Sequence, residues 1–188
     1  RFEATKSRHA RISKIARISR QAKKFFSGSG YTATTWGHQS SYMFRARIDA
    51  LEKKAAAATG INTAGRCRFS ALVFAFGPRG HPTARIIKEI FGSWFQAVKD
   101  FCLDASRGTV ENSFLLLRSA WSRAKQKICS GKAISHSNRH GLLHNVIGWL
   151  LRLSWQPVSI DRWVSPQKDA YILSALSFPT HLVINELV

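Results

Sequence analysis

The pattern of apolar and polar positions along this chain is mainly that of amphipathic helices. Apolar residues recur three and four positions apart in several long segments, and this spacing places them on one face of an α-helix. The segments that show it most clearly are residues 8–26, 41–60, 81–102, 109–131 and 140–155. The pattern therefore predicts a mainly α fold, with five or six helices in a small helical bundle.

The first of these segments combines an apolar stripe with a regular row of cations. The stripe consists of Ile12, Ile15, Ile18, Ala22, Phe25 and Phe26. The basic residues recur at every third position and end in a pair, at Arg8, Arg11, Lys14, Arg17, Arg20, Lys23 and Lys24. Because a helix turns once in about 3.6 residues, cations three apart wind around its surface. We expect the segment to pack on a core, to present these cations to phosphate groups, and to end at the run Ser27–Gly30.

The other segments carry signals for where their helices begin and end. Ser41 and Gly60 are the expected N-cap and C-terminal cap of the second segment. Pro82 suits the first position of the third helix, and Gly92 inside it is expected to allow a close helix crossing. The fifth segment is apolar nearly all round, which indicates a buried helix, and Pro157 is expected to end it.

Two stretches are harder to assign from their pattern. The run FSALVFAF, residues 69–76, is too short for its periodicity to distinguish a strand from a helix, so one short strand near 69–76 stays beside a short helix as an expectation. Residues 158–188 have a mixed pattern that contains two further prolines, and no element is assigned to them.

The formal net charge of the chain is +19, from 29 basic and 10 acidic residues. Residues 1–24 alone hold nine basic residues and one acidic residue. An excess of this size predicts a polyanionic partner, of which nucleic acid is the commonest. An anionic membrane surface is the rival, but no apolar run approaches the roughly 20 residues that a membrane-spanning helix needs. Nucleic acid is therefore the expected partner, with no membrane.

Metal binding is not expected. The three cysteines, Cys67, Cys102 and Cys129, are far apart and odd in number, which fits a reducing compartment and excludes the paired spacing of a zinc finger. The remaining candidates are three histidines spaced four apart, at His136, His140 and His144. On a helix these would lie in a row, about 6 Å apart along the axis, and a row cannot surround one ion.

No complete catalytic site is visible, and no cofactor is expected in this chain. No two of the ten acidic residues are adjacent, and no glycine-rich phosphate loop is present. His38 with Ser40 or Ser41 lacks a nearby acid that could orient the imidazole. Cys67 lies between two arginines, an environment that lowers the pKa of an exposed thiol, although a structural cysteine is the commoner case.

The uncharged stretch YTATTWGHQS, residues 31–40, directly follows the basic segment. It has aromatic residues at Tyr31 and Trp36, and a glycine next to a histidine at Gly37 and His38. From its residues the stretch is either a catalytic or metal-binding loop or a structural hinge between the basic segment and the domain behind it.

Several pieces of the sequence coincide with one known pattern. The pieces are ARISRQAKKFFSGSGYTATTWGHQS (16–40), IDALEKKAAAATGINTAGRCRFSAL (48–72), HPTARIIKEI (81–90), SAWSRAKQKI (119–128) and LLRLSWQPVSIDRW (150–163). In this order and spacing they resemble the region that follows the catalytic palm in reverse transcriptases of LINE-type, non-LTR retrotransposons. The resemblance covers about residues 1–165.

The resemblance implies a nucleic-acid-binding fragment of an RNA-directed DNA polymerase polyprotein. It divides the chain into a basic, thumb-like helical segment (1–60) that contains the 31–40 hinge, a helical post-thumb domain (61–165) and a truncated C-terminal segment (166–188). The polymerase signature, an aromatic residue followed by two aspartates, is absent. The implied partners are therefore template–primer or element RNA and the remainder of the polyprotein, which would carry the chemistry. Both ends of the chain look cut.

The resemblance also bears on residues 31–40. A thumb must place its basic helix on phosphates and anchor it rigidly, so the resemblance favours a structural hinge over a catalytic loop. It implies that Tyr31 and Trp36 are buried anchors. Gly28, Gly30 and Gly37 would then be the bends, and His38 and Gln39 would supply hydrogen bonds to the turn.

Two other interpretations stay open at this point. The first is a basic structural RNA-binding protein of an organellar ribosome, because residues 1–30 also have the Arg- and Ser-rich, acid-poor composition of a mitochondrial transit peptide. The second is a decayed open reading frame without a function. The expected location is the nucleus or cytoplasm, with the mitochondrion as the alternative.

Overall fold

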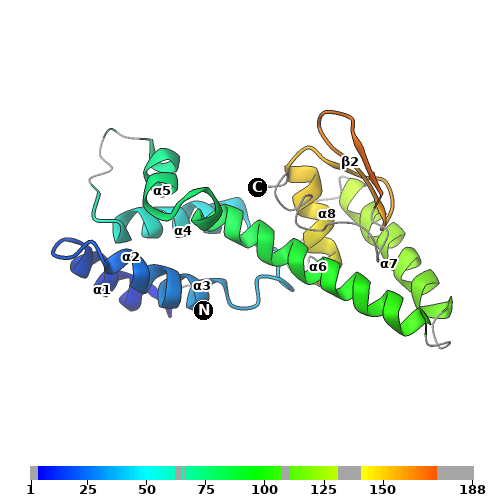
Figure 1. Ribbon diagram of the computed structural model, residues 1–188, viewed down its shortest axis with the longest axis horizontal. Coiled ribbons are helices and arrows are strands. Elements are labelled where there is room, and N and C mark those ends of the chain that lie inside the picture. Colours follow the sequence, from blue (N-terminus) through cyan, green and yellow to red (C-terminus); the bar gives the residue numbers. More distant parts are fainter. Residues whose placement is uncertain (1–3, 62–64, 66, 107–110, 131–140, 173–188) are drawn as a thin grey trace. The chain divides into compact units, whose positions relative to one another are not determined.

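The computed structural model describes residues 4–61, 65, 67–106, 111–130 and 141–172. Most of these residues are helical, which confirms the mainly α fold (Figure 1). The chain divides into two compact units, the first made of residues 1–38 and 43–86 and the second of residues 39–42 and 87–188. Within the described part of the chain, no helix is both long enough and apolar enough to cross a membrane.

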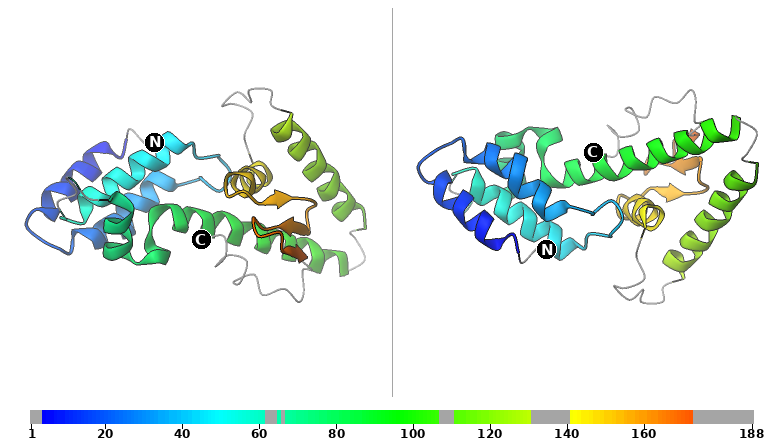
Figure 2. Two further views of the ribbon diagram at one scale, coloured as in Figure 1. Left: turned by 90° about the horizontal axis from the view of Figure 1, so that it is seen from above. Right: turned by 90° about the horizontal axis from the view of Figure 1, so that it is seen from below.

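The first unit is built around one central helix. Its elements are α1 (Lys6–Ala16), α2 (Ala22–Phe25), the π-helical turn η1 (Phe26–Gly30), α3 (Tyr31–Thr35), α4 (Arg45–Ala58), α5 (Arg68–Phe76) and the 3-10 turn η2 (Pro78–Gly80). The central helix is α4, which contacts α1, α2, α3 and α5 (Figures 1 and 2). It buries Ile48, Leu51, Ala55 and Ala58, which recur at spacings of three and four.

The first predicted helix, over 8–26, is interrupted. The helix α1 ends at Ala16, and a turn over residues 17–21 separates it from α2. Ile12, Ala22 and Phe26 are buried as expected, but Ile18 falls in the turn and is 88% exposed, and Phe25 on α2 is 55% exposed. The apolar stripe is therefore wrong at Ile18 and Phe25, because a stripe holds its direction only while the helix is unbroken.

The run Ser27–Gly30 does not end a helix, contrary to expectation. The α2, η1 and α3 segments follow one another without a gap from Ala22 to Thr35. A Cβ atom at Gly30 would lie 3.1 Å from atoms of both His9 and Ile12. Gly30 thus serves a close approach of α1 to this helix rather than a bend, and that packing outweighs the low helix propensity of glycine.

The helix α4 ends at the predicted glycine cap but does not begin at the predicted N-cap. Gly60 follows its C-terminus with φ of +71°, as the glycine cap requires. A Cβ atom at Gly60 would also lie 2.5 Å from the carbonyl oxygen of Ala16, so α1 and α4 come close at this point. Ser41 is not the N-cap, because the helix begins at Arg45 and Phe44 occupies the N-cap position.

Residues 69–76 are helical, so the expectation of a strand near 69–76 is wrong. They belong to α5, which buries Ala71 and Leu72 and leaves Phe69 and Phe74 exposed. Four apolar residues in a row cannot all face one core from a single helix. The run looks continuous in sequence because α5 carries apolar residues on its exposed face as well.

The second unit has an aromatic core. Its helices are the greater part of α6 (Pro82–Ser106), α7 (Glu111–Cys129) and α8 (Leu142–Arg152). Trp121 of α7 lies between Trp94 and Trp163, with ring centroids 5.4 Å and 6.5 Å away. Pro82 begins α6 as predicted, but a Cβ atom at Gly92 would meet no described atom within 4 Å, so the expected close crossing there is wrong.

A small antiparallel sheet follows α8, which ends at Arg152, earlier than Pro157 predicted (Figure 2). The strands are β1 (Gln156–Pro157), β2 (Arg162–Val164) and β3 (Ala170–Ile172), in the order β1-β2-β3. In this register Trp163 pairs with Pro157 on one side and with Tyr171 on the other. The sheet thereby carries the Trp163 ring into the aromatic core.

Candidate nucleic-acid interface

The cations of the first segment lie on α1, α2 and the turn between them. Six of the seven predicted phosphate-binding side chains are exposed, at Arg8, Arg11, Lys14, Arg17, Arg20 and Lys24. We refer to these six residues as the basic face. None of them forms an ion pair with a carboxylate in the part of the chain that the structure describes. Their charges are therefore available to an external anion.

Lys23, the seventh predicted residue, has a structural bond. Its side chain is half-buried, and its Nζ atom donates a hydrogen bond of 3.0 Å to the carbonyl oxygen of Ala75. Ala75 is in the last turn of α5, where carbonyl oxygens lack partners within the helix. Lys23 thus caps α5 and joins it to α2, an interaction that cation spacing alone does not reveal.

The two units differ strongly in charge. The first unit contains 17 basic and 3 acidic residues, a net formal charge of +14. The second contains 12 basic and 7 acidic residues, a net of +5. Most of the excess that predicts a polyanionic partner is therefore concentrated in the unit that carries the basic face.

The inner side of α1 is neutral and fixed in place. His9 is buried, and its Nε2 atom lies 2.7 Å from Oγ1 of Thr34. The Thr34 hydroxyl donates to the carbonyl oxygen of Gly30, so its oxygen accepts from His9 and the imidazole proton is on Nε2. Burial, with Lys54 and Arg8 nearby, lowers the pKa of His9 from 6.5 to about 4. In the sequence, the only signal for His9 is that one histidine stands in line with the apolar stripe.

Of the four predicted hinge residues, two are buried and one makes a bend. Tyr31 is buried, as expected of an anchor, and the guanidinium carbon of Arg85 lies 4.0 Å from the centre of its ring. His38 is buried and its Nδ1 atom donates to the carbonyl oxygen of Thr35 at 2.6 Å. Gly37 has φ of +76° and makes the bend. The boundary between the two units follows at once, after His38.

Trp36 is not a buried anchor, and that expectation is wrong. Its side chain is 72% exposed. Trp36 is five residues after the buried Tyr31, which on a helix is about 140° around the axis, so the two rings face different sides. Trp36 is also the C-cap of α3, with extended ψ of 122°, where the chain leaves the helix. Of the two aromatic rings of this stretch, only that of Tyr31 is buried.

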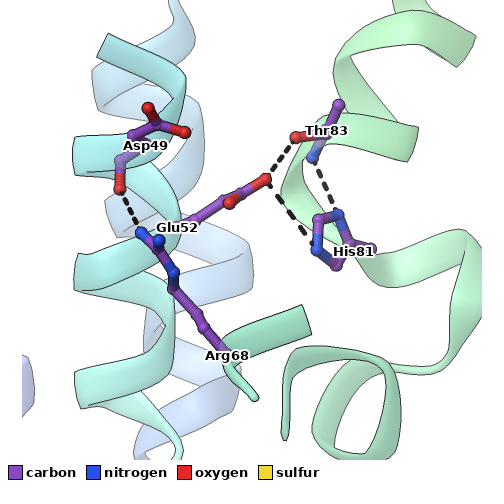
Figure 3. Close-up of polar contacts among 5 residues, drawn as sticks. All are labelled: Asp49, Glu52, Arg68, His81 and Thr83. Carbon is purple, nitrogen blue, oxygen red and sulfur yellow. Dashed lines mark hydrogen bonds and ion pairs between the residues drawn. The ribbon is translucent and has the colours of Figure 1, made fainter. Parts of the chain in front are cut away.

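A polar cluster joins α4 to the start of α6 (Figure 3). The Thr83 hydroxyl donates a hydrogen bond of 2.6 Å to Oε1 of Glu52, and the Thr83 backbone N–H donates to Nδ1 of His81 at 3.3 Å. Nε2 of His81 lies 3.9 Å from the same Glu52 oxygen. Nearby, the Arg68 guanidinium donates to the backbone carbonyl oxygen of Asp49 at 3.2 Å.

This cluster is a helix cap rather than a catalytic triad. Burial lowers the pKa of His81, and Glu52 offsets part of that effect, so the imidazole is neutral and can accept at Nδ1. The Thr83 hydroxyl donates its hydrogen bond to the Glu52 carboxylate. A nucleophilic hydroxyl would instead donate to an imidazole base that can take its proton. The sequence signal that could have identified the cap is the dipeptide His81–Pro82, with the histidine just before the first helical residue.

Catalytic and metal-binding groups do not gather elsewhere in the described part of the chain. Within it, no three histidine, cysteine, aspartate or glutamate side chains lie together in a way that could hold a metal ion. His144 lies on α8, whereas His136 and His140 lie outside the described residues. Among the described residues the basic face is therefore the candidate interface, and its exposed cations suit phosphate groups.

Comparisons with known proteins found no relative of this chain. No family model, no curated protein and no solved structure matches this chain.

Proposed function

We propose that this chain binds nucleic acid through the basic face, with the phosphates of an RNA or RNA–DNA duplex as its ligands. One observation carries the proposal: six exposed cations within 17 residues of chain have no carboxylate partner among the described residues. Arginine and lysine on such a face bind phosphates with little dependence on base sequence. The neutral, hydrogen-bonded inner side of α1 would hold the face rigid against the duplex.

We further propose that the chain is a segment of a retrotransposon reverse transcriptase, downstream of its catalytic palm. The support is the order and spacing of the motifs from ARISRQ to SIDRW. The chain has no adjacent pair of acidic residues, so the metal-dependent chemistry would belong to another part of the polyprotein. The nucleus or the cytoplasm would be its location. An upstream reading frame that encodes an aromatic residue and two aspartates would support this assignment, and its absence would contradict it.

The binding proposal is tested by the salt dependence of affinity. Each phosphate neutralised releases a counterion, so six contacts predict a slope of roughly −5 for log K against log salt on a duplex. The measurement is fluorescence anisotropy with a labelled 20-base-pair RNA–DNA hybrid over a salt series. The variant Arg11→Gln/Arg17→Gln should weaken binding and reduce the slope by about two.

A matched control is available in the second unit. Arg123 and Lys127 are exposed residues of α7, four positions apart in the sequence. The variant Arg123→Gln/Lys127→Gln removes the same charge and should leave the slope within error of the wild-type value. Equal losses in both variants would mean that diffuse net charge is responsible, and the basic face would then not be the interface.

A further inference from the structure

A groove of about 900 Å³ adjoins the basic face in the first unit. One side of it is a single face of α5, formed by residues spaced three and four apart that include Cys67, Ser70 and Phe74. The opposite side includes Arg20 and Lys23 from the turn and α2, and Gly60 from the end of α4. The volume is within the range of about 300–1,000 Å³ that is usual for small-molecule sites.

The groove combines a flat apolar ring with positive charge. Phe74 is 88% exposed although it lies on a helix whose other face is in the core. The Nζ atom of Lys23 is held in place by its bond to Ala75, and Arg20 makes no hydrogen bond or ion pair with any residue that the structure describes. An aromatic face next to two cations matches the two parts of a nucleotide, a base that stacks and a phosphate that is charged.

We propose that this groove takes an unpaired nucleotide of a single-stranded segment, with its base against Phe74 and its phosphate at Arg20. The inference rests on the proposed function and names a second class of ligand for the same surface. Arg20 belongs both to the basic face and to the groove, so a strand bound along the basic face reaches Phe74 without a break in the positive charge. Bases within a duplex are stacked and paired and cannot reach such a ring, so the ligand must be single-stranded.

Cys67 provides a built-in reporter for the groove. It is exposed at the N-cap of α5. The polar hydrogens of Ser70 and of the Phe69 backbone nearby, with a contribution from Arg68, lower the pKa of the Cys67 thiol. A thiol of this kind reacts readily with iodoacetamide. Cys129 is exposed on α7 in the second unit and is not one of the groove residues, so it serves as the internal control.

The first test compares two phenylalanines of α5. The probes are a labelled ten-nucleotide oligouridylate and a labelled RNA–DNA hybrid at the same salt concentration. Phe74→Ala should weaken oligouridylate binding by about 5- to 150-fold, the range for loss of one base–aromatic stack, and should change hybrid binding less than twofold. Phe69→Ala removes an exposed ring outside the groove and should affect neither ligand. Because Phe74 is exposed, the midpoint of thermal unfolding should stay at the wild-type value.

The second test follows alkylation by mass spectrometry. Saturating oligouridylate should slow the alkylation of Cys67 at least several-fold and leave that of Cys129 unchanged. Equal protection of both cysteines, or equal protection of Cys67 by polyglutamate, would overturn the proposal, because either result would show that the groove does not select a nucleotide.

The outcomes separate this inference from the proposed function. Wild-type protein that binds the hybrid, together with an unchanged oligouridylate affinity in Phe74→Ala, overturns the groove and leaves the basic face standing. Wild-type protein that binds neither probe overturns the basic face, and the groove falls with it.

Discussion

The Nε2 atom of His9 on α1 lies 2.7 Å from the hydroxyl oxygen of Thr34 on α3, and this bond fastens the inner side of the basic helix. The Thr34 hydroxyl also lies 3.3 Å from that of Thr5 and donates to Gly30, so one side chain joins three positions of the first unit. The bond requires a proton on Nε2, which the imidazole carries in both its neutral and its charged form. A second proton would go to Nδ1, which is buried and has no hydrogen-bond partner among the described residues. The folding of α1 is linked to the protonation of His9 because burial and the nearby charges of Lys54 and Arg8 disfavour the charged imidazole.

We predict that the first unit loses stability as the pH falls from 6.5 towards 4. The pKa of His9 is about 4 in the fold and 6.5 in the unfolded chain, so the unfolded chain binds the extra proton throughout this window. The stabilisation is complete above pH 6.5 and declines by up to about 3 kcal/mol, at roughly 1.4 kcal/mol per pH unit. Urea unfolding at pH 7.5, 5.5 and 4.5 measures it.

The control for this prediction is His9→Gln, which keeps a donor for Thr34 but cannot titrate. The lowered pKa of His81 acts in the same direction, and it is present in both proteins, so the difference between the two pH profiles isolates His9. Parallel profiles for the wild type and His9→Gln would contradict the prediction.

Two glycines should respond to alanine in opposite directions. Gly60 has φ of +71°, and an added Cβ would lie 2.5 Å from the backbone oxygen of Ala16. Gly60→Ala should therefore destabilise the protein by at least about 1–3 kcal/mol. Gly92 is inside α6 with no described atom within 4 Å of an added Cβ, so Gly92→Ala should stabilise by about 0.5–1 kcal/mol. Denaturant midpoints of the two variants should move apart; a shift of both in one direction would contradict this.

The long helices could be predicted from the sequence because each has one apolar face in the core. Buried positions such as Ile48, Leu51, Ala55 and Ala58 on α4 repeat at three and four residues over several turns. Periodicity averages over those turns, so one exception does not hide the helix. The basic face was predictable for the same reason, since exposed cations need no tertiary partner.

The features that could not be predicted depend on contacts distant in sequence. Gly30 continues a helix because His9 packs on it, and Lys23 is half-buried because α5 ends beside it. The three strands have only two or three residues each, too few for an alternating pattern to register. The burial of Trp36 is expected from the hinge that the resemblance implies, but its position around α3 relative to Tyr31 decides its exposure.

Trp36 and Tyr31 should differ clearly in their effect on stability. Tyr31 is fully buried under the Arg85 guanidinium, and Tyr31→Ala should cost about 3–5 kcal/mol, as for other large buried aromatic side chains. Trp36 is 72% exposed, so Trp36→Ala should change the free energy of unfolding by no more than about 0.5 kcal/mol. Chemical denaturation of both variants measures this. A loss of several kcal/mol in Trp36→Ala would contradict this prediction and indicate that Trp36 is a buried anchor. A loss of affinity for single strands without a loss of stability would indicate that Trp36 contacts the nucleic acid.

Trp163 should be the most sensitive position of the second unit. It is fully buried on β2, and its ring centroid lies 5.6 Å from those of both Phe91 and Phe95 and 6.5 Å from that of Trp121, to which it is nearly parallel. Trp163→Ala removes a ring that three others contact, so the cost should reach about 3–5 kcal/mol from lost burial and the cavity left behind. Trp163→Phe keeps part of the contact, so its free energy of unfolding should lie between that of the wild type and that of Trp163→Ala. Leu116→Ala, an exposed site on α7, should be nearly neutral. If Trp163→Ala were as stable as Leu116→Ala, the sheet would not be packed on α6 and α7 as described.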